Sequence, residues 1–530
     1  MTGQLLVNAR VYPLTPGGDP QASAVAINDG KVVAIGDETA CRDSLSFGAA
    51  EVFDCGGRAV IPGLIDAHMH MELTALARSA VAAETATVGE CLSRVAAAAS
   101  RAPAGAWVTG QGWNQNDWGG IFPTATDLDA VAPHHPVYLQ VKSAHAAWVN
   151  SVALRLAGVD AHTPDPEGGR IVRDAQGVPT GILLETAMAL VQRHIPPIDV
   201  AQLADLYAEQ QAEAWRWGLT GVHDFDGRRS LAAWQVLRER GQLGLRVVKT
   251  IRAAYLDQAL ALGLRPGFGD DWIRLGQVKV FMDGALGPRT AWMAAPYEGE
   301  PDNVGVTVTD PEELAEIGER AADAGFALTV HAIGDRANHE VLNVFERLLT
   351  LNRRPTLPYR VEHVQVAHPA DLARLGALGV VASMQPLHAT SDAPAAERLW
   401  GLGRSANAYA WRSVLSGGAV LACGSDSPIE SLNPWTGIHA AVTRRRADGW
   451  PGSDGWFPEQ RLTVAEALAG YTSGAALAGG MRARTRGLVP GALADLVVLD
   501  RDPFACDPNE LREVTAVATL VGGQWRRREI

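Results

Sequence analysis

This chain of 530 residues has no CxxC pair of cysteines, no hydrophobic run long enough to span a membrane and no excess of positive charge. Its five cysteines form no CxxC pair and are odd in number, which argues against a disulfide framework and favours a reducing compartment. No apolar run reaches the roughly 20 residues of a membrane span. The amino terminus, MTGQLLVNARVYP, lacks a basic segment followed by a long apolar one, so we predict no signal peptide. We therefore expect a cytoplasmic protein.

The charge balance excludes further classes of partner. A formal net charge of −13 argues against a general nucleic-acid or anionic-membrane surface. The hydrophobic fraction of 47% is that of a soluble globular protein, and a chain of this length can bury a large core. We expect a small molecule as the ligand, with no nucleic acid and no membrane as partners.

The two ends of the chain resemble each other and differ from the middle. Residues 1–60 and 481–530 alternate short apolar runs with turns, and neither end alone has enough strands for a stable core. This predicts one small β-sandwich domain built from both chain termini. Residues 61–480 instead alternate strand-like runs with Ala/Leu-rich helical stretches, which is typical of parallel βα units.

Eight strand-like runs can be counted in the middle region, and eight parallel strands with outer helices make an α/β fold, the (β/α)8 TIM barrel. The predicted strands are 60–66, 137–142, 220–225, 274–281, 327–331, 359–363, 379–385 and 419–425. Residues 71–136 and 143–219 are long insertions for such a barrel. We expect them to fold over its mouth and to shape the substrate pocket.

Six chemically reactive residues stand at or just past the ends of these runs. Chemistry in a TIM barrel lies at the carboxyl ends of the strands, and imidazoles with carboxylates are the ligands of catalytic metal sites. On candidate strands one, four, five, six and eight the residues are His68 and His70, Lys279, His331, His363 and Asp426. The pattern predicts a metal-dependent hydrolase.

The histidines carry most of this prediction. His68 and His70 are two apart, so on a strand both rings point to the same side and can face one cation. The alternative is a pair of ordinary surface histidines. His331 and His363 each end a similar run, and either one alone is equally well interpreted as a buried structural histidine.

Asp426 and Lys279 each have two interpretations. Asp426 is either a metal-bound carboxylate that accepts a proton from the nucleophilic water, or the N-cap of a helix. Lys279 lies inside the apolar run QVKVFMDG, where an ammonium needs a partner. Either it pairs with Asp283 or Glu185, or its neutral amine reacts with carbon dioxide to give a carbamate that bridges two cations.

Five further residues are candidates for the substrate pocket. Trp113 and Trp118 line its mouth or pack within a cap. His145 polarises a substrate carbonyl or begins a helix. Arg289 holds a substrate carboxylate or braces its own loop, and Glu185 orients Lys279, contacts a metal, or does neither.

Several longer blocks of sequence are distributed along nearly the whole chain: PGLIDAHMH, GWNQNDW, SAHAAWVNS, PTGILLETA, KVFMDGALGPRTA, HAIGDRAN, RVEHVQ, GSDSPIESLNPW and PGALADLVVLDRDP. In these blocks the chain resembles the amidohydrolase superfamily. It most resembles the branch of N-substituted formamide deformylases and YtcJ-like hydrolases. The family's more common GSLGSRTA reads GALGPRTA here, so only hydrogen bonds from the loop with Ala285 and Pro288 are in doubt.

The resemblance implies a binuclear metal centre. His68 and His70 would bind the more buried metal, and His331 and His363 the second. A carboxylated Lys279 would bridge the two, and Asp426 would be metal ligand and proton shuttle. The ligand set suits zinc, and also manganese, cobalt or iron.

The resulting prediction is a metal-dependent amidohydrolase that cleaves a small amide-like C–N bond, of the N-substituted formamide or N-acyl type. The alternatives are a lactone or ester hydrolase, a deaminase on the same site, and a non-catalytic binding protein. Dimers are common in the family, so a homodimer is the oligomer that the resemblance suggests.

Overall fold

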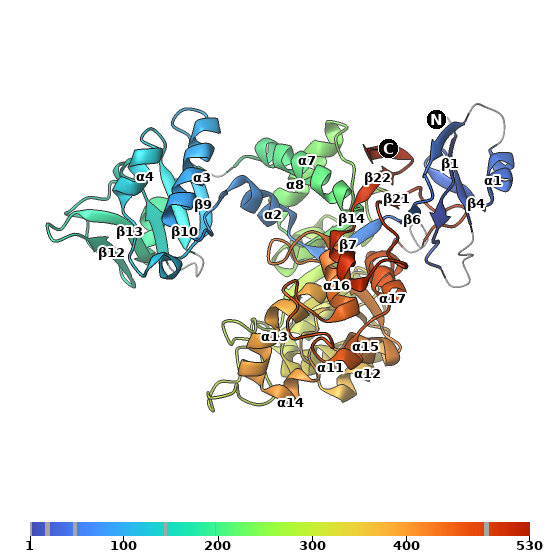
Figure 1. The fold of residues 1–530 in the computed structure, drawn as a ribbon. Coiled ribbons are helices and arrows are strands. Elements are labelled where there is room, and N and C mark those ends of the chain that lie inside the picture. Colours follow the sequence, from blue (N-terminus) through green and yellow to red (C-terminus); the bar gives the residue numbers. More distant parts are fainter. Residues whose placement is uncertain are drawn as a thin grey trace. The chain divides into compact units, whose positions relative to one another are not determined.

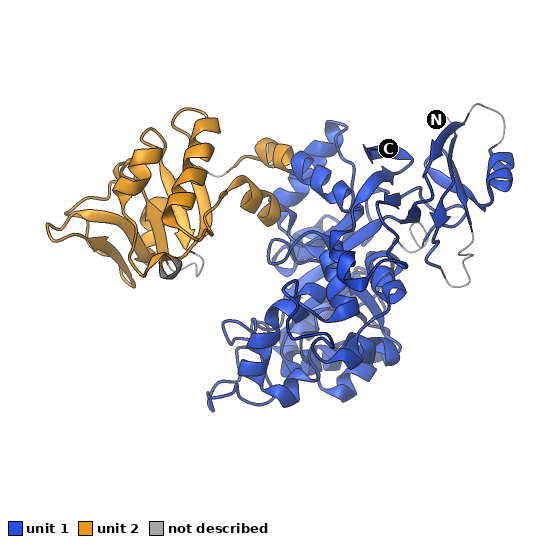
Figure 2. Ribbon diagram, in the orientation of Figure 1, with its two compact units in different colours: residues 1–71, 207–530 blue, residues 72–206 orange. Residues whose placement is uncertain are grey.

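The computed structural model describes residues 3–15, 22–45, 50–141, 146–196, 198–481 and 487–529, without the side chains of residues 116 and 117. These residues form two compact units (Figure 2). The first comprises residues 1–71 and 207–530, and the second comprises residues 72–206.

A parallel eight-stranded barrel forms the centre of the first unit, as the sequence predicts. Its strands pair in the order β7 (Leu64–Met69), β14 (Leu219–Asp224), β15 (Arg246–Arg252), β16 (Ile273–Phe281), β17 (Leu328–Ala332), β18 (Arg360–His363), β19 (Val381–Met384) and β20 (Val420–Cys423). Just past β20, the Asp426 amide donates to the His68 carbonyl at 2.7 Å, and the His70 amide donates to the Ser427 carbonyl at 2.9 Å. These bonds join the last strand to the first and bring Asp426 beside both histidines.

Helices follow the strands in the pattern of a TIM barrel. The longer ones are α7 (Val200–Arg216), α8 (Arg228–Glu239), α10 (Pro311–Asp323), α11 (Asp335–Thr350), α12 (Pro369–Ala377), α13 (Pro386–Trp400) and α16 (Pro434–Thr443). The shorter ones are α9 (Leu256–Ala261), α14 (Leu402–Ser405), α15 (Trp411–Ser416), α17 (Val464–Ala469) and α18 (Ala475–Ala478). Helix α10 shows how local sequence sets a start: the Asp310 side chain accepts the first free amides and Pro311 takes the first helical position.

Two of the predicted barrel strands are corrected by the structure. The run 60–66 is divided at Gly63, where a Cβ would lie 2.2 Å from Thr220 Oγ1, and only its second part enters the barrel. The run 137–142 is β10 (Val137–Val141), which belongs to a sheet of the second unit. The true third strand, β15, was missed because its sequence, RVVKTIR, begins and ends with charged residues.

The two chain termini form the predicted β-sandwich domain. One sheet has the order β4 (Lys31–Gly36), β3 (Ala24–Asn28), β1 (Gln4–Val7) and β5 (Glu51–Asp54). The other has the order β2 (Arg10–Val11), β6 (Ala59–Pro62), β21 (Leu496–Leu499), β22 (Ala516–Val521) and β23 (Gln524–Arg528). The blue strand β6 and the red strand β21 pair directly (Figure 1), and one hydrophobic core contains residues of both termini, such as Leu6 and Leu496. Helix α1 (Glu38–Ser44) follows β4.

The second unit has its own sheet and its own core. Its strands pair in the order β12 (Gly169–Arg173), β13 (Pro179–Glu185), β11 (Ala146–Val149), β10, β9 (Val108–Trp113) and β8 (Val81–Ala82). Helices α3 (Val88–Arg101), α4 (Ala125–Val131), α5 (Ser151–Ala157) and α6 (Ala189–Gln192) lie in the same unit, which α2 (Met71–Ser79) joins to β7. Residues 72–136 of the first predicted insertion and 143–206 of the second therefore belong to one folded unit, whereas residues 207–219 belong to the first unit.

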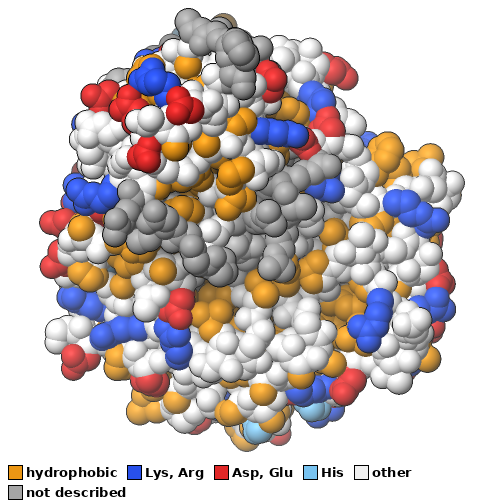
Figure 3. Space-filling view, turned by 90° about the vertical axis from the view of Figure 1, so that its right-hand side faces the viewer, with side chains coloured by type: hydrophobic (Ala, Val, Ile, Leu, Met, Phe, Trp, Pro, Cys, Tyr) orange, Lys and Arg blue, Asp and Glu red, His pale blue; other side chains and the backbone are white. Residues whose placement is uncertain are grey.

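The molecular surface carries charges of both signs. Acidic and basic side chains are interspersed on the face drawn in Figure 3. Among the residues that the structure describes, no helix combines the length and the hydrophobicity needed to cross a membrane.

Candidate metal centre

Four barrel strands, β7, β17, β18 and β20, bring five of the six predicted ligands together at their carboxyl ends. The Nε2 atoms of His68 and His70 lie 3.5 Å and 3.4 Å from Asp426 Oδ1. The His68 ring lies 4.9 Å from the His363 ring, which in turn lies 4.5 Å from the His331 ring. Ligand atoms of His68, His70 and Asp426 all fall within 4.8 Å of one another, as one cation requires.

The outward nitrogens of the first two histidines are held by carboxylates. His68 Nδ1 lies 2.6 Å from Glu362 Oε2, and His70 Nδ1 lies 3.0 Å from Asp226 Oδ1. A carboxylate on Nδ1 fixes the proton there, so that Nε2 is the nitrogen whose lone pair could bind a metal. The donor set and its supports therefore fit a divalent cation.

Glu362 is part of a charged network inside the barrel. Its Oε1 lies 2.9 Å from Arg360 Nε and accepts from the Thr329 hydroxyl. Arg360 also donates to the Ala67 carbonyl and the Ser383 hydroxyl. Although burial alone would raise the pKa of Glu362, the charge of Arg360 and the hydrogen bond from His68 hold it well below its usual range.

The protonation of the two histidines differs. Burial lowers the pKa of His68 to about 4, so this imidazole is neutral and able to ligate. Burial also opposes the charged form of His70, but hydrogen bonds to Asp226 and Asp426 outweigh it and raise the pKa to about 9. A cation at His70 would take the place of that proton.

His331 and His363 also present one nitrogen each to the site. His331 Nε2 lies 2.8 Å from the Gly284 carbonyl, and His363 Nδ1 lies 2.7 Å from Gln385 Oε1. Those contacts leave Nδ1 of His331 and Nε2 of His363 as the ring atoms that could bind a metal. Burial lowers the pKa of both rings, that of His331 to about 3, so both are neutral donors. His363 ends its strand with φ 76°, an uncommon conformation that is often found at functional sites.

Lys279 lies in an apolar setting beside the histidines. Its amine is 4.9 Å from the centre of the Phe225 ring and 4.6 Å from that of Phe281. Burial lowers the pKa of this amine to about 8, so a larger neutral fraction is present near neutrality than for an exposed lysine. The sequence offered Asp283 and Glu185 as ion-pair partners of Lys279. In the structure, Asp283 accepts the backbone amides of Trp292, Ile333 and Gly334. Glu185 belongs to the second unit.

The structure decides against the capping interpretation of Asp426. Helix α16 begins at Pro434 and its N-cap is Asn433. Asp426 itself has φ 57°. Gly424 allows this approach, because a Cβ there would lie 2.4 Å from the His68 amide nitrogen. The carboxylate keeps its pKa below the usual range because contacts with His70, His68 and His363 outweigh the effect of burial.

Three of the residues predicted to line the substrate pocket make packing or ion-pair contacts within their own unit. Trp113 is fully buried in the core of the second unit and donates its indole N–H to the Leu139 carbonyl, so it packs rather than lining a mouth. Trp118 stacks on Trp113 in that unit and donates to the Thr85 carbonyl. Arg289 forms an ion pair with Glu300, which braces its own loop. His145 lies outside the described residues.

Four residues of the site were not predicted from the sequence: Glu362, Asp226, Gln385 and His388. His388 lies in the first turn of α13, and together with His363 and Asp426 it forms a second group with ligand atoms within 4.8 Å of one another. A signal for Glu362 was present, since RVEH places two charged residues, Arg360 and Glu362, on one face of a short buried strand. The other three follow strands in loops or helix starts and carry no periodic signal.

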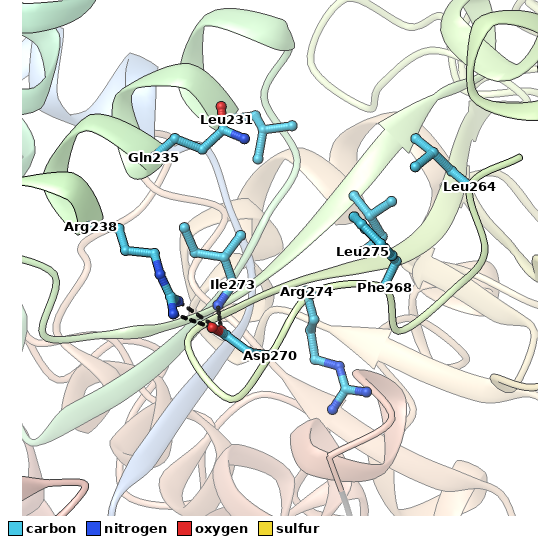
Figure 4. Close-up of a pocket in the computed structure, with 10 residues that line it drawn as sticks. Leu231, Gln235, Arg238, Leu264, Phe268, Asp270, Ile273, Arg274 and Leu275 are labelled. Atoms are coloured by element: carbon cyan, nitrogen blue, oxygen red, sulfur yellow. Dashed lines mark hydrogen bonds and ion pairs between the residues drawn. The ribbon is translucent and has the colours of Figure 1, made fainter. Parts of the chain in front are cut away.

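A separate cavity of about 380 Å³ lies between α8 and the segment that leads into β16 (Figure 4). Leu231, Leu264 and Leu275 form its apolar wall, and Arg238 pairs with Asp270 at one side. None of its ten lining residues is a candidate metal ligand.

Comparisons with known proteins agree with this geometry. The sequence profile of the amidohydrolase family matches residues 51–526. The chain is 32% identical over 525 residues to the putative amidohydrolase YtcJ of Bacillus subtilis, covering 97% of each chain. It is 30% identical over 551 residues to the N-substituted formamide deformylase of Arthrobacter pascens, covering 99% of this chain and 98% of the relative.

A solved structure extends the likeness to three dimensions. An uncharacterized metal-dependent hydrolase from Pyrococcus furiosus superimposes with a TM-score of 0.79 at 28% identity, over 95% of this chain and 100% of that one. The family match spans most of the chain, including every candidate metal ligand. The chain therefore belongs to the amidohydrolase family.

Proposed function

We propose that this hydrolase cleaves a small amide-like C–N bond, of the N-substituted formamide or N-acyl type. The observation that carries the proposal is the convergence of four histidines, Asp426 and a desolvated Lys279 at one end of the barrel. The Arthrobacter relative, named as an N-substituted formamide deformylase, supports the choice of bond.

The proposed cofactor is a pair of divalent cations, with zinc as the first candidate. His68, His70 and Asp426 would hold one of them through Nε2 atoms and Oδ1. His331 and His363 would hold the other through the nitrogens left free by Gly284 and Gln385. A histidine and carboxylate ligand set also accepts manganese, cobalt or iron.

Lys279 would complete the pair as a carbamate. The neutral amine attacks carbon dioxide, a C–N bond forms, and the amine releases one proton, so the product carries one negative charge. Burial favours the neutral amine that this step needs. A carbamate would also place an anion beside the two metals, where a protonated lysine would place a cation, and so would remove a repulsion.

A bound divalent cation would lower the pKa of a water ligand to about 7 and polarise a carbonyl oxygen. The residues of this chain then handle the proton. Asp426 lies within 3.5 Å of both first-strand histidines, so it can accept the water proton as hydroxide attacks the carbonyl carbon. It can pass the same proton to the leaving nitrogen when the C–N bond breaks, which returns Asp426 to its carboxylate form.

The proposal is tested by supplying the metal and the bond. Protein stripped with a chelator and reloaded with zinc should release formate from a panel of N-alkyl and N-aryl formamides. N-acyl amino acids, lactones and an aminopyrimidine in the same panel would reveal acyl-amide, ester or deaminase activity instead. Equal formate release by metal-free protein, verified by elemental analysis, would contradict the proposal. Elemental analysis of Lys279→Ala tests the carbamate: we expect about two metals per chain in wild type and fewer in the variant.

A further inference from the structure

We infer that His388 is a further catalytic residue, which donates a hydrogen bond from Nε2 to the substrate oxygen that becomes negatively charged during hydrolysis. The inference rests on the proposed hydrolysis at the metal centre, and no part of the predicted ligand set includes this residue. It follows from the place of His388 beside Asp426.

His388 is buried, yet one of its ring nitrogens lacks a protein partner. The residue is 6% exposed, and among the described residues Nε2 has no hydrogen-bond partner. Leaving a buried polar atom without a partner is unfavourable, so such an atom calls for an explanation. Here the missing partner is supplied by the substrate.

The residues around His388 Nε2 indicate where the substrate oxygen would lie. Asp426 Oδ1 faces the Nε2 atoms of His68 and His70, whereas Asp426 Oδ2 faces His388 Nε2 at 3.8 Å. That distance is too long for a direct hydrogen bond. A substrate whose leaving nitrogen takes a proton from Asp426 must place its reacting atoms within a few ångströms of this carboxylate, and therefore within reach of His388.

The other ring nitrogen indicates that Nε2 is the donor. Gln365 Nε2 lies 3.4 Å from His388 Nδ1 and is oriented to donate to it. A neutral imidazole that accepts at Nδ1 carries its proton on Nε2. The ring is also held parallel to that of His363, with 6.2 Å between the centres, at the start of α13. A fixed donor aimed at developing charge is the arrangement that stabilises an oxyanion.

Three substitutions separate the two ring nitrogens. The amide nitrogen of glutamine reaches close to the position of Nε2, whereas that of asparagine reaches only that of Nδ1. His388→Gln should therefore keep most of the hydrogen bond to the substrate oxygen. His388→Asn and His388→Ala should lose this hydrogen bond. His439→Gln is the matched control, because His439 is a buried histidine of the same unit that contacts Thr443.

The readout that does not depend on turnover is binding of methylphosphonate, whose charged oxygens imitate the tetrahedral stage. Titration calorimetry on zinc-loaded, full-length protein should show binding weakened by about tenfold to a hundredfold in His388→Ala and His388→Asn. Binding to His388→Gln and His439→Gln should stay near wild type. Zinc content should be equal in all five proteins. Turnover of any substrate found with the panel should fall on the order of a hundredfold in His388→Ala.

Two results would overturn the inference. Loss of zinc from His388→Asn and His388→Ala would make His388 a metal ligand, in line with its proximity to His363 and Asp426. Unchanged methylphosphonate binding in both would make it a packing residue. Failure of the formamide panel with the predicted binding pattern intact would instead count against the proposed substrate and not against His388.

Discussion

Two regions of the metal centre contrast in how they hold a histidine. On the floor, inside the barrel, His68 is held by Glu362, which is itself paired with Arg360, and all three side chains are at most 1% exposed. At the rim His70 is held by Asp226 and is 18% exposed. The same contact, a carboxylate on Nδ1, is thus made once in the barrel interior and once at its opening.

From this difference we infer that the carboxylates of Glu362 and Asp226 have different main tasks. Removing one member of a buried ion pair leaves an uncompensated charge in a medium of low dielectric constant, so Glu362 is required by the fold as well as by His68. Asp226 is itself buried, but the His70 ring that it holds is partly exposed to solvent, so we expect its task to be mainly to orient His70 and to increase its basicity. Asp426 lies within 3.5 Å of both histidines, and we expect it to act in the chemistry instead.

The largest effect on turnover should come from a substitution of Asp426, which lies beside both His68 and His70. Asp426→Asn keeps the size of the side chain but cannot accept the water proton. We expect turnover to fall by roughly a hundredfold to ten-thousandfold, with some metal retained. Steady-state kinetics together with elemental analysis measure this. Near wild-type turnover at full metal content would show that another group moves the proton.

The next effect tests the floor. Glu362→Gln should lower the free energy of unfolding by about 3–5 kcal/mol, because Arg360 would lose the charge that compensates it. Urea denaturation of metal-free protein separates this loss from metal binding. The double variant Arg360→Met with Glu362→Leu is the control and should be less destabilised than Glu362→Gln alone. A loss below about 1 kcal/mol in Glu362→Gln would remove the distinction between floor and rim.

The sequence was informative where chemistry and periodicity coincide. His68, His70, His331 and His363 stand at or near the ends of apolar strands, so one pattern predicted the barrel, which the structure confirms, and the place where these four rings meet. Glu362 was overlooked because a charged residue in a strand is usually taken as exposed, and only the long-range contact with His68 shows otherwise. β10 was assigned to the barrel because a short apolar run looks the same in either sheet.

The pocket predictions had a different weakness. Trp113 and Arg289 were chosen for their side-chain type, and the structure gives each an ordinary structural contact. Aromatic and basic side chains serve packing and ion pairs as readily as ligands, so residue type without strand position did not select among them. His388 was missed for the converse reason, since it stands in a helix start.

A third test addresses the rim. Asp226→Asn should weaken metal binding by roughly tenfold to a hundredfold, with a smaller loss of stability than Glu362→Gln, because the histidine that it holds is partly exposed to solvent. Competition titration with a zinc-binding dye gives the affinity. Asp371→Asn is the matched control, since Asp371 contacts the surface histidine His339 and should leave zinc affinity unchanged. Equal losses of stability in Asp226→Asn and Glu362→Gln would mean that burial does not separate the two regions.

The smallest effect on stability is expected from an ion pair that is more exposed to solvent than either of these two contacts. Glu466 binds Arg412 through two contacts of 2.6 Å and completes the capping box of α17 with Thr463, and both charged side chains are about one-third exposed. The hydrogen bond from Arg412 lowers the pKa of Glu466 from 4.5 to about 2. A depressed carboxyl pKa stabilises the fold fully above the unfolded value of 4.5, and this stabilisation is lost as the pH falls toward 2. Because solvent screens the pair, Glu466→Gln should cost less than about 1 kcal/mol at pH 7, and the difference from wild type should shrink at pH 3 and in 1 M salt. A loss as large as that of Glu362→Gln, unaffected by salt, would show that exposure does not set the strength of these carboxylate contacts.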